Sequence, residues 1–224
     1  MLYNEANMKE TRSPLAGKRG VFITIEGIDG SGKTTHVNRL NTVLDERGFS
    51  VIQLREPGGT DIGESIRQIL LSRKNDGMTS ETELLLFEAA RAQLVRDVIE
   101  PALAAGKIVL SDRFMDSTVA YQGYGRGMDL DLIERLNAFA VGSCRPDLTV
   151  LLDVEPLEAA SRVDKRSQSD RMDDAGLAFM ERTRAGYLAI AAREPQRVRV
   201  LSALPPKDEL HAQIMTIIKE GFGI

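Results

Sequence analysis

Hydrophobic and polar residues follow one another along the chain in two periods, which together predict an α/β fold. Short apolar runs rich in β-branched residues are typical of buried parallel strands, and they occur at 21–25, 50–54, 107–110, 148–152 and 197–201. Apolar residues at helical spacing separate these runs. We expect helices after the first strand and at 61–71, 81–105, 130–141, 177–193 and 207–219, with one more beginning at Pro156. Pro101 should kink or break the longest helix. This alternation predicts five parallel strands with helices on both faces of the sheet.

The loop after the first strand carries the motif that most strongly indicates chemistry. Gly27-Ile28-Asp29-Gly30-Ser31-Gly32-Lys33-Thr34 fits the pattern G-x-x-x-x-G-K-[ST], between a predicted strand and a predicted helix as the motif requires. The glycines let backbone N–H groups surround phosphate oxygens at the positive end of a helix. Lys33 would then reach the outer phosphates, and the Thr34 hydroxyl would bind Mg²⁺. The sequence therefore predicts a P-loop NTPase fold that binds ATP with Mg²⁺.

Composition excludes several classes of protein. The 224 residues suit one domain, which we place at 19–224, after a polar and flexible extension at 1–18. A net charge of −4 with 5% aromatic residues offers neither a basic field nor a stacking platform, so we expect no nucleic-acid partner. No apolar run approaches the roughly 18 residues of a membrane span, so we expect no membrane association. The single cysteine, Cys144, suits a cytoplasmic protein, in which it would be a small buried hydrophobe.

Polar residues follow the predicted strands at their carboxyl ends, where parallel sheets bind ligands. Asp112 comes directly after an apolar strand, where a P-loop enzyme needs a second carboxylate for Mg²⁺. A solvated aspartate at a strand end is the alternative. We place Arg55, Arg91 and Arg113 around the same rim, because two arginines that converge on one phosphate can bind an acceptor monophosphate.

Two further patterns leave alternatives open. Phe87 and Arg91 share one helix face at spacing i and i+4, so that a ring and a donor could bind a base. Phe87 also continues a stripe with Leu84 and Leu94 that could be core. The segment 162–174 is dense in charges of both signs and is usually a solvated surface. In a phosphoryl-transfer enzyme it also suits a mobile lid that excludes water and brings an arginine to the transition state.

Together, these ordered motifs resemble the thymidylate kinase family, whose members phosphorylate dTMP with ATP. The resemblance runs from about Gly20 to the C-terminus. The segments that carry it are Glu26 to Thr34, Arg55 to Thr60, Phe87 to Arg91, Asp112 to Phe114, Ser117 to Gly123, Arg145 to Asp147, and Asp170 with Arg171. It implies in-line transfer of the γ-phosphoryl group of ATP to dTMP, with Mg²⁺ bound, in a cytoplasmic homodimer.

The resemblance also implies roles for individual residues. For the base, Phe87 stacks on thymine and Arg91 forms a hydrogen bond with its edge, while the pocket for base and sugar is lined by Ser117, Thr118, Tyr121 and Gln122. For the phosphate and the sugar, Arg55 and Arg113 hold the dTMP phosphate, and Asp29 contacts the acceptor sugar and the metal site. On the donor side, Arg162 flanks adenine. The P-loop contains no arginine, which is typical of a branch, common in bacteria, that supplies the catalytic arginine from the lid. Arg166 is our candidate, and it completes a catalytic set with Lys33, Asp29 and Arg113.

Other functions stay open on the sequence alone. A related kinase for another monophosphate or a deoxynucleoside would use similar motifs. A GTPase-like switch would need an Asn-Lys-x-Asp motif, which the sequence lacks, and would leave Phe87 and Arg55 without a task. An ATPase without an acceptor is harder to exclude. For the homodimer, the contact face could be formed by Leu85, Ala89, Ala92 and Val95, which could equally be core.

Overall fold

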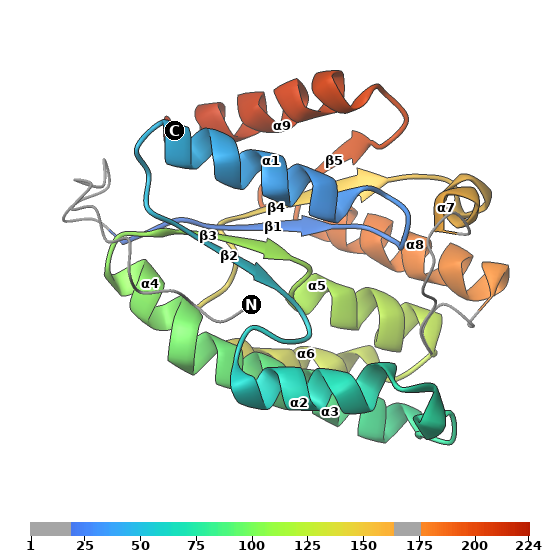
Figure 1. Ribbon diagram of the computed structural model, residues 1–224. Coiled ribbons are helices and arrows are strands. Elements are labelled where there is room, and N and C mark those ends of the chain that lie inside the picture. Colours follow the sequence, from blue (N-terminus) through green and yellow to red (C-terminus); the bar gives the residue numbers. More distant parts are fainter. Residues whose placement is uncertain (1–18, 164–175) are drawn as a thin grey trace.

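The computed structural model describes residues 19–163 and 176–224, and within these ranges five parallel strands form one sheet. The strands are β1 (Phe22–Glu26), β2 (Val51–Arg55), β3 (Ile108–Asp112), β4 (Leu148–Asp153) and β5 (Val198–Ser202), in the order β2-β3-β1-β4-β5 (Figure 1). The predicted extension at 1–18 and most of the predicted lid, including Arg166, lie outside the described residues. The predicted α/β class with five parallel strands is confirmed, and the structure adds that the strand before the P-loop, β1, lies at the centre of the sheet.

Each strand continues one or two residues beyond its apolar run and ends on a polar side chain. These last residues are Glu26, Arg55, Asp112, Asp153 and Ser202. Hydropathy places the strand ends too early, because a polar residue at the edge of a sheet can still form the backbone ladder. Since parallel strands end at one edge, the five residues share the rim at which ligands of such sheets bind.

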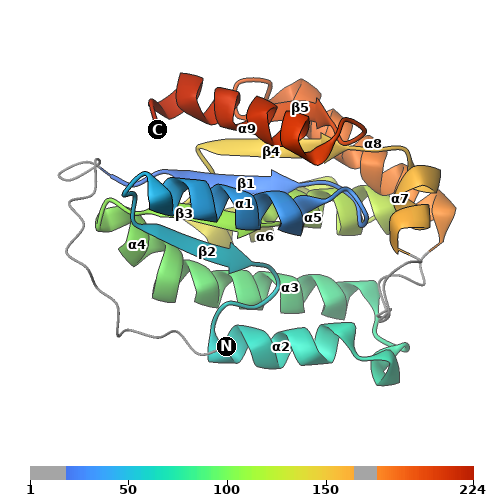
Figure 2. The same ribbon diagram turned by 45° about the horizontal axis from the view of Figure 1, so that its top comes forward.

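Helices cover both faces of the sheet, as predicted (Figures 1 and 2). One face carries α1 (Lys33–Glu46) and α9 (Lys207–Phe222). The other side carries α3 (Ser80–Leu94), α4 (Glu100–Ala104), α5 (Met115–Thr118), α6 (Leu130–Val141) and α8 (Leu177–Arg193). α2 (Asp61–Leu71) packs against α3, and α7 (Pro156–Val163) lies near the carboxyl ends of the strands.

The expected helix at 81–105 is interrupted before its proline. α3 is followed by the π-helical segment η3 (Val95–Ile99) and then by α4, so the helix type changes ahead of Pro101. Pro101 then lies in α4, and the backbone stays helical through both junctions, with Val95, Ile99 and Glu100 in the αR region. The expected kink or break at Pro101 is therefore a change of helix type a few residues earlier, and the chain is not broken there.

Three short features were not predicted. Helix α5 and the π-helical segment η4 (Val119–Gly125) follow β3, although the glycines of this region have low helix propensity. Close packing explains them, since a Cβ on Gly125 would lie 2.6 Å from the ring of Phe179 on α8. A 3₁₀ turn, η2 (Arg73–Asn75), follows α2. Thr60 caps α2, because its hydroxyl accepts the Gly63 N–H at 2.9 Å.

The apolar core forms two clusters, and neighbouring side chains of β1 belong to different clusters because side chains alternate along a strand. On β1, Phe22 packs in a cluster with residues of α3 and α4, whereas Ile23 and Ile25 pack in a cluster with residues of α1. Fully burying side chains of this size stabilises a fold by about 1.5–3 kcal/mol each. Cys144 is a buried free thiol in the first cluster, as expected. No helix of the described part of the chain is long and apolar enough to cross a membrane.

Candidate active site

The P-loop connects the end of β1 to the start of α1 and leaves the positive end of that helix open. Gly27, Gly30 and Gly32 have φ angles of 141°, 85° and 93°, which side-chain-bearing residues rarely adopt. Gly32 caps α1 without a side-chain hydrogen bond. The buried hydroxyl of Ser31 has no hydrogen-bond partner among the described residues. Free N–H groups and an unpartnered hydroxyl at a helix N-terminus are suited to bind phosphate oxygens.

Close packing holds the loop in this shape. A Cβ on Gly27 would lie 2.5 Å from the carbonyl oxygen of Leu152 in β4, and one on Gly30 would lie 2.3 Å from that of Ala159 in α7. Both contacts are with backbone atoms, which cannot rotate away. These two positions of the motif therefore accept only glycine, for reasons of space as well as of backbone conformation.

Lys33 lies beneath the loop with its ammonium group directed towards the phosphate position. Its Nζ donates to the Ile28 carbonyl at 2.9 Å and lies 4.0 Å from Oδ1 of Asp29. Burial and the charge of Arg113 lower the pKa of Lys33 to about 8, against the opposing effect of Asp29. An anionic ligand here would restore the full positive charge of this side chain.

Thr34 and Asp112 meet at the mouth of the loop, where the sequence predicts the metal. The Thr34 hydroxyl donates to Oδ2 of Asp112 at 2.5 Å. A hydroxyl and a carboxylate oxygen are hard ligands of the kind that Mg²⁺ prefers. Among the described residues, no cluster of three or more His, Cys, Asp and Glu side chains could hold a metal unaided. The two residues therefore fit a metal whose other ligands come from phosphate and water.

Arg113 joins the P-loop to the wall formed by α5 and η4. Its φ of 72° is the only positive value for a non-glycine residue in the described part of the chain. Nη2 donates to Oδ1 of Asp29 at 2.7 Å and to the Tyr121 hydroxyl at 2.9 Å, and that hydroxyl donates to Oδ2 of Asp29 at 2.9 Å. Burial raises the pKa of Asp29, but the charges of Arg113 and Lys33 outweigh it and hold that pKa below its usual range.

The predicted base-binding residues line one side of this site, on α3 and on α5 with η4. Phe87 is half-buried and belongs to neither apolar cluster, so it is not part of the core. Ser117 is half-buried, whereas Thr118 and Gln122 are buried, and the Gln122 amide donates to Glu83 at 2.9 Å. The structure thus brings these side chains to the same wall as Tyr121, which contacts Asp29 and Arg113.

Arg91 lies beneath this wall and is 1% exposed. Nη2 donates to Glu56 at 2.6 Å and to the Phe114 carbonyl at 3.2 Å. Nη1 has three acceptors at 2.6–2.8 Å, namely Glu88, Thr118 and Asn137. With the Nε bond to Glu56 at 2.9 Å, all five N–H groups have acceptors inside the protein. The expectation that Arg91 stands at the rim is therefore wrong, because carboxylates from two segments hold it in the interior. A bond to the edge of a base would need exchange of one of these partners.

Two other predicted residues occupy opposite sides of the rim. Arg55 is paired in register with Asp112 on the neighbouring strand, at the same edge of the sheet as Arg113. It donates to Glu64 at 2.9 Å and to the Pro57 carbonyl at 3.0 Å. Arg162, in α7, donates to the carbonyl of Ala203 in the loop after β5 at 3.2 Å. This contact joins α7, where Arg162 is expected to flank adenine, to the loop after β5.

Glu26 and Tyr187 belong to this site but were given no role from the sequence. The Tyr187 hydroxyl, from α8, lies 2.8 Å from Oε2 of Glu26 and 3.1 Å from Nη1 of Arg113. Glu26 precedes the P-loop motif directly, which was a usable signal. Tyr187 lies in an apolar helical stripe, which gave no signal of a role in the site.

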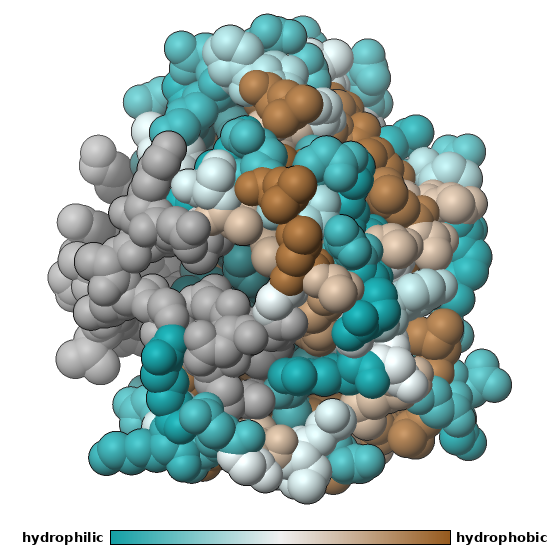
Figure 3. Space-filling view, turned by 90° about the vertical axis from the view of Figure 1, so that its right-hand side faces the viewer, coloured by the Kyte–Doolittle hydropathy of each residue, from teal (hydrophilic) through white to brown (hydrophobic). Residues whose placement is uncertain are grey.

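Figure 3 looks onto this end of the molecule, where apolar side chains (brown) run from the top towards the middle between polar ones (teal).

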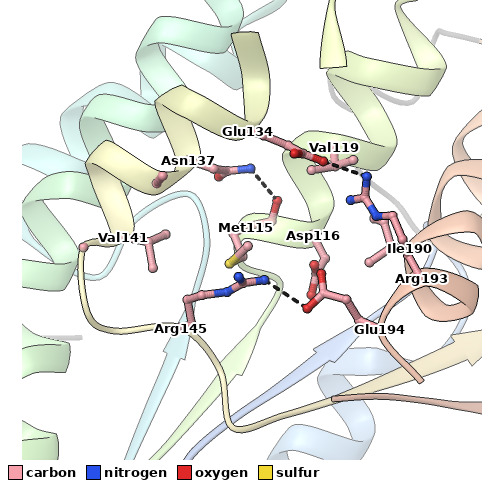
Figure 4. A pocket seen from close by; sticks show the side chains of 12 residues that line it. Met115, Asp116, Val119, Glu134, Asn137, Val141, Arg145, Ile190, Arg193 and Glu194 are labelled. Carbon is pink, nitrogen blue, oxygen red and sulfur yellow. Dashed lines mark hydrogen bonds and ion pairs between the residues drawn. The ribbon is translucent and has the colours of Figure 1, made fainter. Parts of the chain in front are cut away.

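A second hollow lies on the far side of the α5 and η4 wall (Figure 4). This cavity of about 460 Å³ is bordered by α5, α6 and α8, and includes Met115. Two ion pairs border it, between Arg145 and Glu194 at 3.0 Å and between Arg193 and Glu134 at 2.7 Å. It contains none of the predicted site residues.

A P-loop on the central strand, with Arg113 bound to its Asp29 and Arg55 at the end of β2, defines a P-loop phosphotransferase. The sequence model of the family described as thymidylate kinase matches residues 25–214. Thymidylate kinase of Chlorobaculum parvum is 47% identical over an alignment that covers 89% of this chain and 95% of that protein. Thymidylate kinase of Desulforudis audaxviator is 50% identical over 82% of this chain and 83% of that protein. The crystal structure of thymidylate kinase from Ehrlichia chaffeensis has a TM-score of 0.73 at 37% identity and covers 90% of this chain and 99% of that one. The chain belongs to the thymidylate kinase family.

Proposed function

We propose that this protein transfers the γ-phosphoryl group of ATP to dTMP, giving dTDP and ADP. The observation that carries the proposal is the position of Arg113. It lies beside the P-loop, bound to Asp29 within that loop, and also donates to Tyr121 on the wall that carries the predicted base-binding residues. A phosphate-binding loop and an acceptor pocket thus adjoin through one ion pair.

On the acceptor side, Arg113 and Arg55 would hold the dTMP phosphate as charge-assisted hydrogen-bond donors. Phe87 would stack on thymine, and Gln122, Thr118 and Ser117 would line the pocket for base and sugar. Asp29 and Tyr121, which already share a hydrogen bond, would face the sugar. Arg91 would act through Thr118, to which it donates at 2.8 Å.

On the donor side, the N–H groups of Gly27 to Thr34, the Ser31 hydroxyl and Lys33 would bind the phosphates of ATP, with Arg162 beside adenine. Thr34 and Asp112 would hold Mg²⁺, which supplies charge neutralisation on the phosphate oxygens when bound. An oxygen of the dTMP phosphate forms a bond to the γ-phosphorus as the bond to the β–γ bridging oxygen breaks. The phosphate is already ionised, so the protein supplies position and positive charge rather than a base. We assign the transition-state arginine to Arg166, which lies outside the described residues.

The test is an acceptor panel of dTMP, dUMP, UMP, CMP and dAMP, with ATP, in an assay of ADP release. We expect the largest kcat/KM with dTMP, and a preference over dUMP of about 10- to 200-fold, since one methyl group contributes about 1–3 kcal/mol. Faster turnover of another acceptor would replace the substrate. ADP release that no acceptor stimulates would favour an ATPase.

We also propose a cytoplasmic homodimer that pairs through α3 and α6. Leu85 and Ala89 are exposed on α3 one helical turn apart, and Leu132 and Phe139 are exposed two turns apart on the adjacent α6, Phe139 to 81%. Val95 is core, so it drops out of the face suggested by the sequence. Phe139→Glu should elute as a monomer in gel filtration, whereas Val200→Glu, on exposed β5, should elute as the wild type does. Equal elution of all three proteins would contradict this interface.

A further inference from the structure

Glu26, the last residue of β1, is a fully buried carboxylate that receives three hydrogen bonds. Oε1 accepts the backbone N–H of Phe114 at 2.7 Å. Oε2 accepts the hydroxyls of Ser117 at 2.7 Å and of Tyr187 at 2.8 Å. The three donors come from the segment after β3, from α5 and from α8, so one side chain joins three elements around the acceptor pocket.

The same two hydroxyls support Arg113. Its Nη1 lies 3.1 Å from the Tyr187 oxygen and 3.3 Å from the Ser117 oxygen, with the Gly27 carbonyl at 3.0 Å. A hydroxyl has one hydrogen to donate and lone pairs with which to accept. The two hydroxyl oxygens also lie 2.8 Å apart, so either could donate to the other. Because an ionised carboxylate can only accept and is within 2.8 Å of both oxygens, we assign both hydrogens to Glu26, which leaves lone pairs for the guanidinium.

We propose that Glu26 is a positioning residue for the acceptor phosphate, because it sets the direction of the two hydroxyls that hold Arg113. The inference rests on the proposed function, in which Arg113 binds that phosphate. Arg113 has a positive φ, and the Phe114 N–H next to it is bound to Glu26 as well. The carboxylate therefore holds both the backbone and the side-chain support of this arginine.

The ionised state that this arrangement needs is available at the pH of a kinase assay. Burial and the nearby Asp116 raise the pKa of Glu26 to about 6, against the charge of Arg113. At pH 8 the carboxyl group is thus almost entirely ionised. All measurements below are made at that pH, so that protonation does not contribute.

Glu26→Gln tests the proposal because an amide has one accepting and one donating end. If its oxygen faces Phe114, its NH₂ faces the two hydroxyls and turns their hydrogens towards Arg113. If the amide is reversed, its NH₂ faces the Phe114 N–H. We expect the KM for dTMP to rise about tenfold or more, while the KM for ATP stays within twofold and so shows an intact fold and donor site.

The second variant is Tyr187→Phe, alone and combined with Glu26→Gln. Removing the hydroxyl removes one of the hydrogens that the amide would misdirect. Glu26→Gln should therefore raise the KM for dTMP at least threefold less in the Tyr187→Phe background than in the wild type. A Glu26 that merely stabilises the fold would give multiplicative effects. If Glu26→Gln is insoluble, Tyr187→Phe and Ser117→Ala carry the test, and each should raise the KM for dTMP and leave that for ATP unchanged.

Glu194→Gln is the control, since this glutamate lies just beyond α8 and pairs with Arg197 and, on the border of the second cavity, with Arg145 (Figure 4). It should leave both KM values within twofold of the wild type. Arg113→Lys separates the two levels of inference. If it leaves the KM for dTMP unchanged, the proposed role of Arg113 fails. If Arg113→Lys raises that KM but Glu26→Gln does not, or if the double variant is multiplicative, the role of Glu26 is overturned.

Discussion

Lowering the pH from 8 to 5 should weaken the fold through one buried histidine of the P-loop helix. His36 lies on α1 and is 2% exposed, and its Nδ1 has no hydrogen-bond partner among the described residues. Its ring stacks on that of His211 from α9, with centroids 6.2 Å apart. Burial, then the charges of His211, Arg39 and Lys207, lower its pKa from 6.5 to about 4.

The sign follows from which form the folded state prefers. The folded protein holds His36 neutral, whereas the unfolded chain protonates it below about pH 6.5. Its contribution to stability is therefore complete above pH 6.5 and is lost as the pH falls towards 4. Linkage between the two pKa values gives a loss of about 2 kcal/mol from pH 8 to pH 5, and about 3 kcal/mol below pH 4. Against a total stability of about 5–15 kcal/mol, this loss is measurable.

The assay is urea unfolding at pH 8, 7, 6 and 5 of the wild type and of His36→Leu. Glu26 and Glu56 have raised pKa values of about 6 and 7 and act in the opposite direction, but both proteins contain them. The difference between the two pH profiles therefore isolates His36. We expect the wild type to lose about 2 kcal/mol more than the variant between pH 8 and pH 5. Profiles that run parallel within 0.5 kcal/mol, roughly the additivity error of such comparisons, would refute this reasoning.

Three further predictions concern the P-loop and the lid. With a pKa near 8, Lys33 is about half protonated at pH 8 in the free protein. Because bound ATP favours the charged form, binding should take up about half a proton. Calorimetry in buffers of different ionisation enthalpy measures this uptake. Lys33→Arg should take up none. Gly30→Ala should abolish ATP binding or folding, because the added Cβ would lie 2.3 Å from a backbone oxygen. The control is Gly48→Ala, since Gly48 has a similar φ of 83° but open space around the added Cβ. This control should lose only about 1–2 kcal/mol of stability and keep its KM for ATP. Arg166→Ala should lower kcat far more than it raises the KM for dTMP, as a transition-state contact requires, and an unchanged kcat would remove that assignment.

Local rules made the framework predictable from the sequence. The strands and most helices follow from hydrophobic period, and α6 and α8 begin and end at the predicted residues. The P-loop is predictable because its chemistry lies within eight consecutive residues, whose conformation is dictated by glycine and by the strand and helix on either side. No long-range information was needed for either feature.

The acceptor side depended on contacts that no local pattern contains. The spacing of Phe87 and Arg91 established that they share a face of α3, but not how deep each lies. Arg91 is buried because Glu56 and Asn137, distant in the chain, supply acceptors for it. Likewise η4 is helical in spite of Gly123 and Gly125, since it packs against α8. Depth and partners come from tertiary packing, which one sequence does not display.

The electrostatics of the P-loop bear on how the two proposed phosphate sites would act together. Lys33, which we propose for the donor side, and Arg113, which we propose for the acceptor side, both approach Asp29, at 4.0 and 2.7 Å. One carboxylate thus faces two cations, and the remaining repulsion, together with burial, lowers the pKa of Lys33. Phosphate groups on both sides would supply the missing negative charge without moving any of the three side chains. Positive charge that is fixed in advance needs little reorganisation during transfer, and such preorganisation is the largest single contribution that a site without a general base can make.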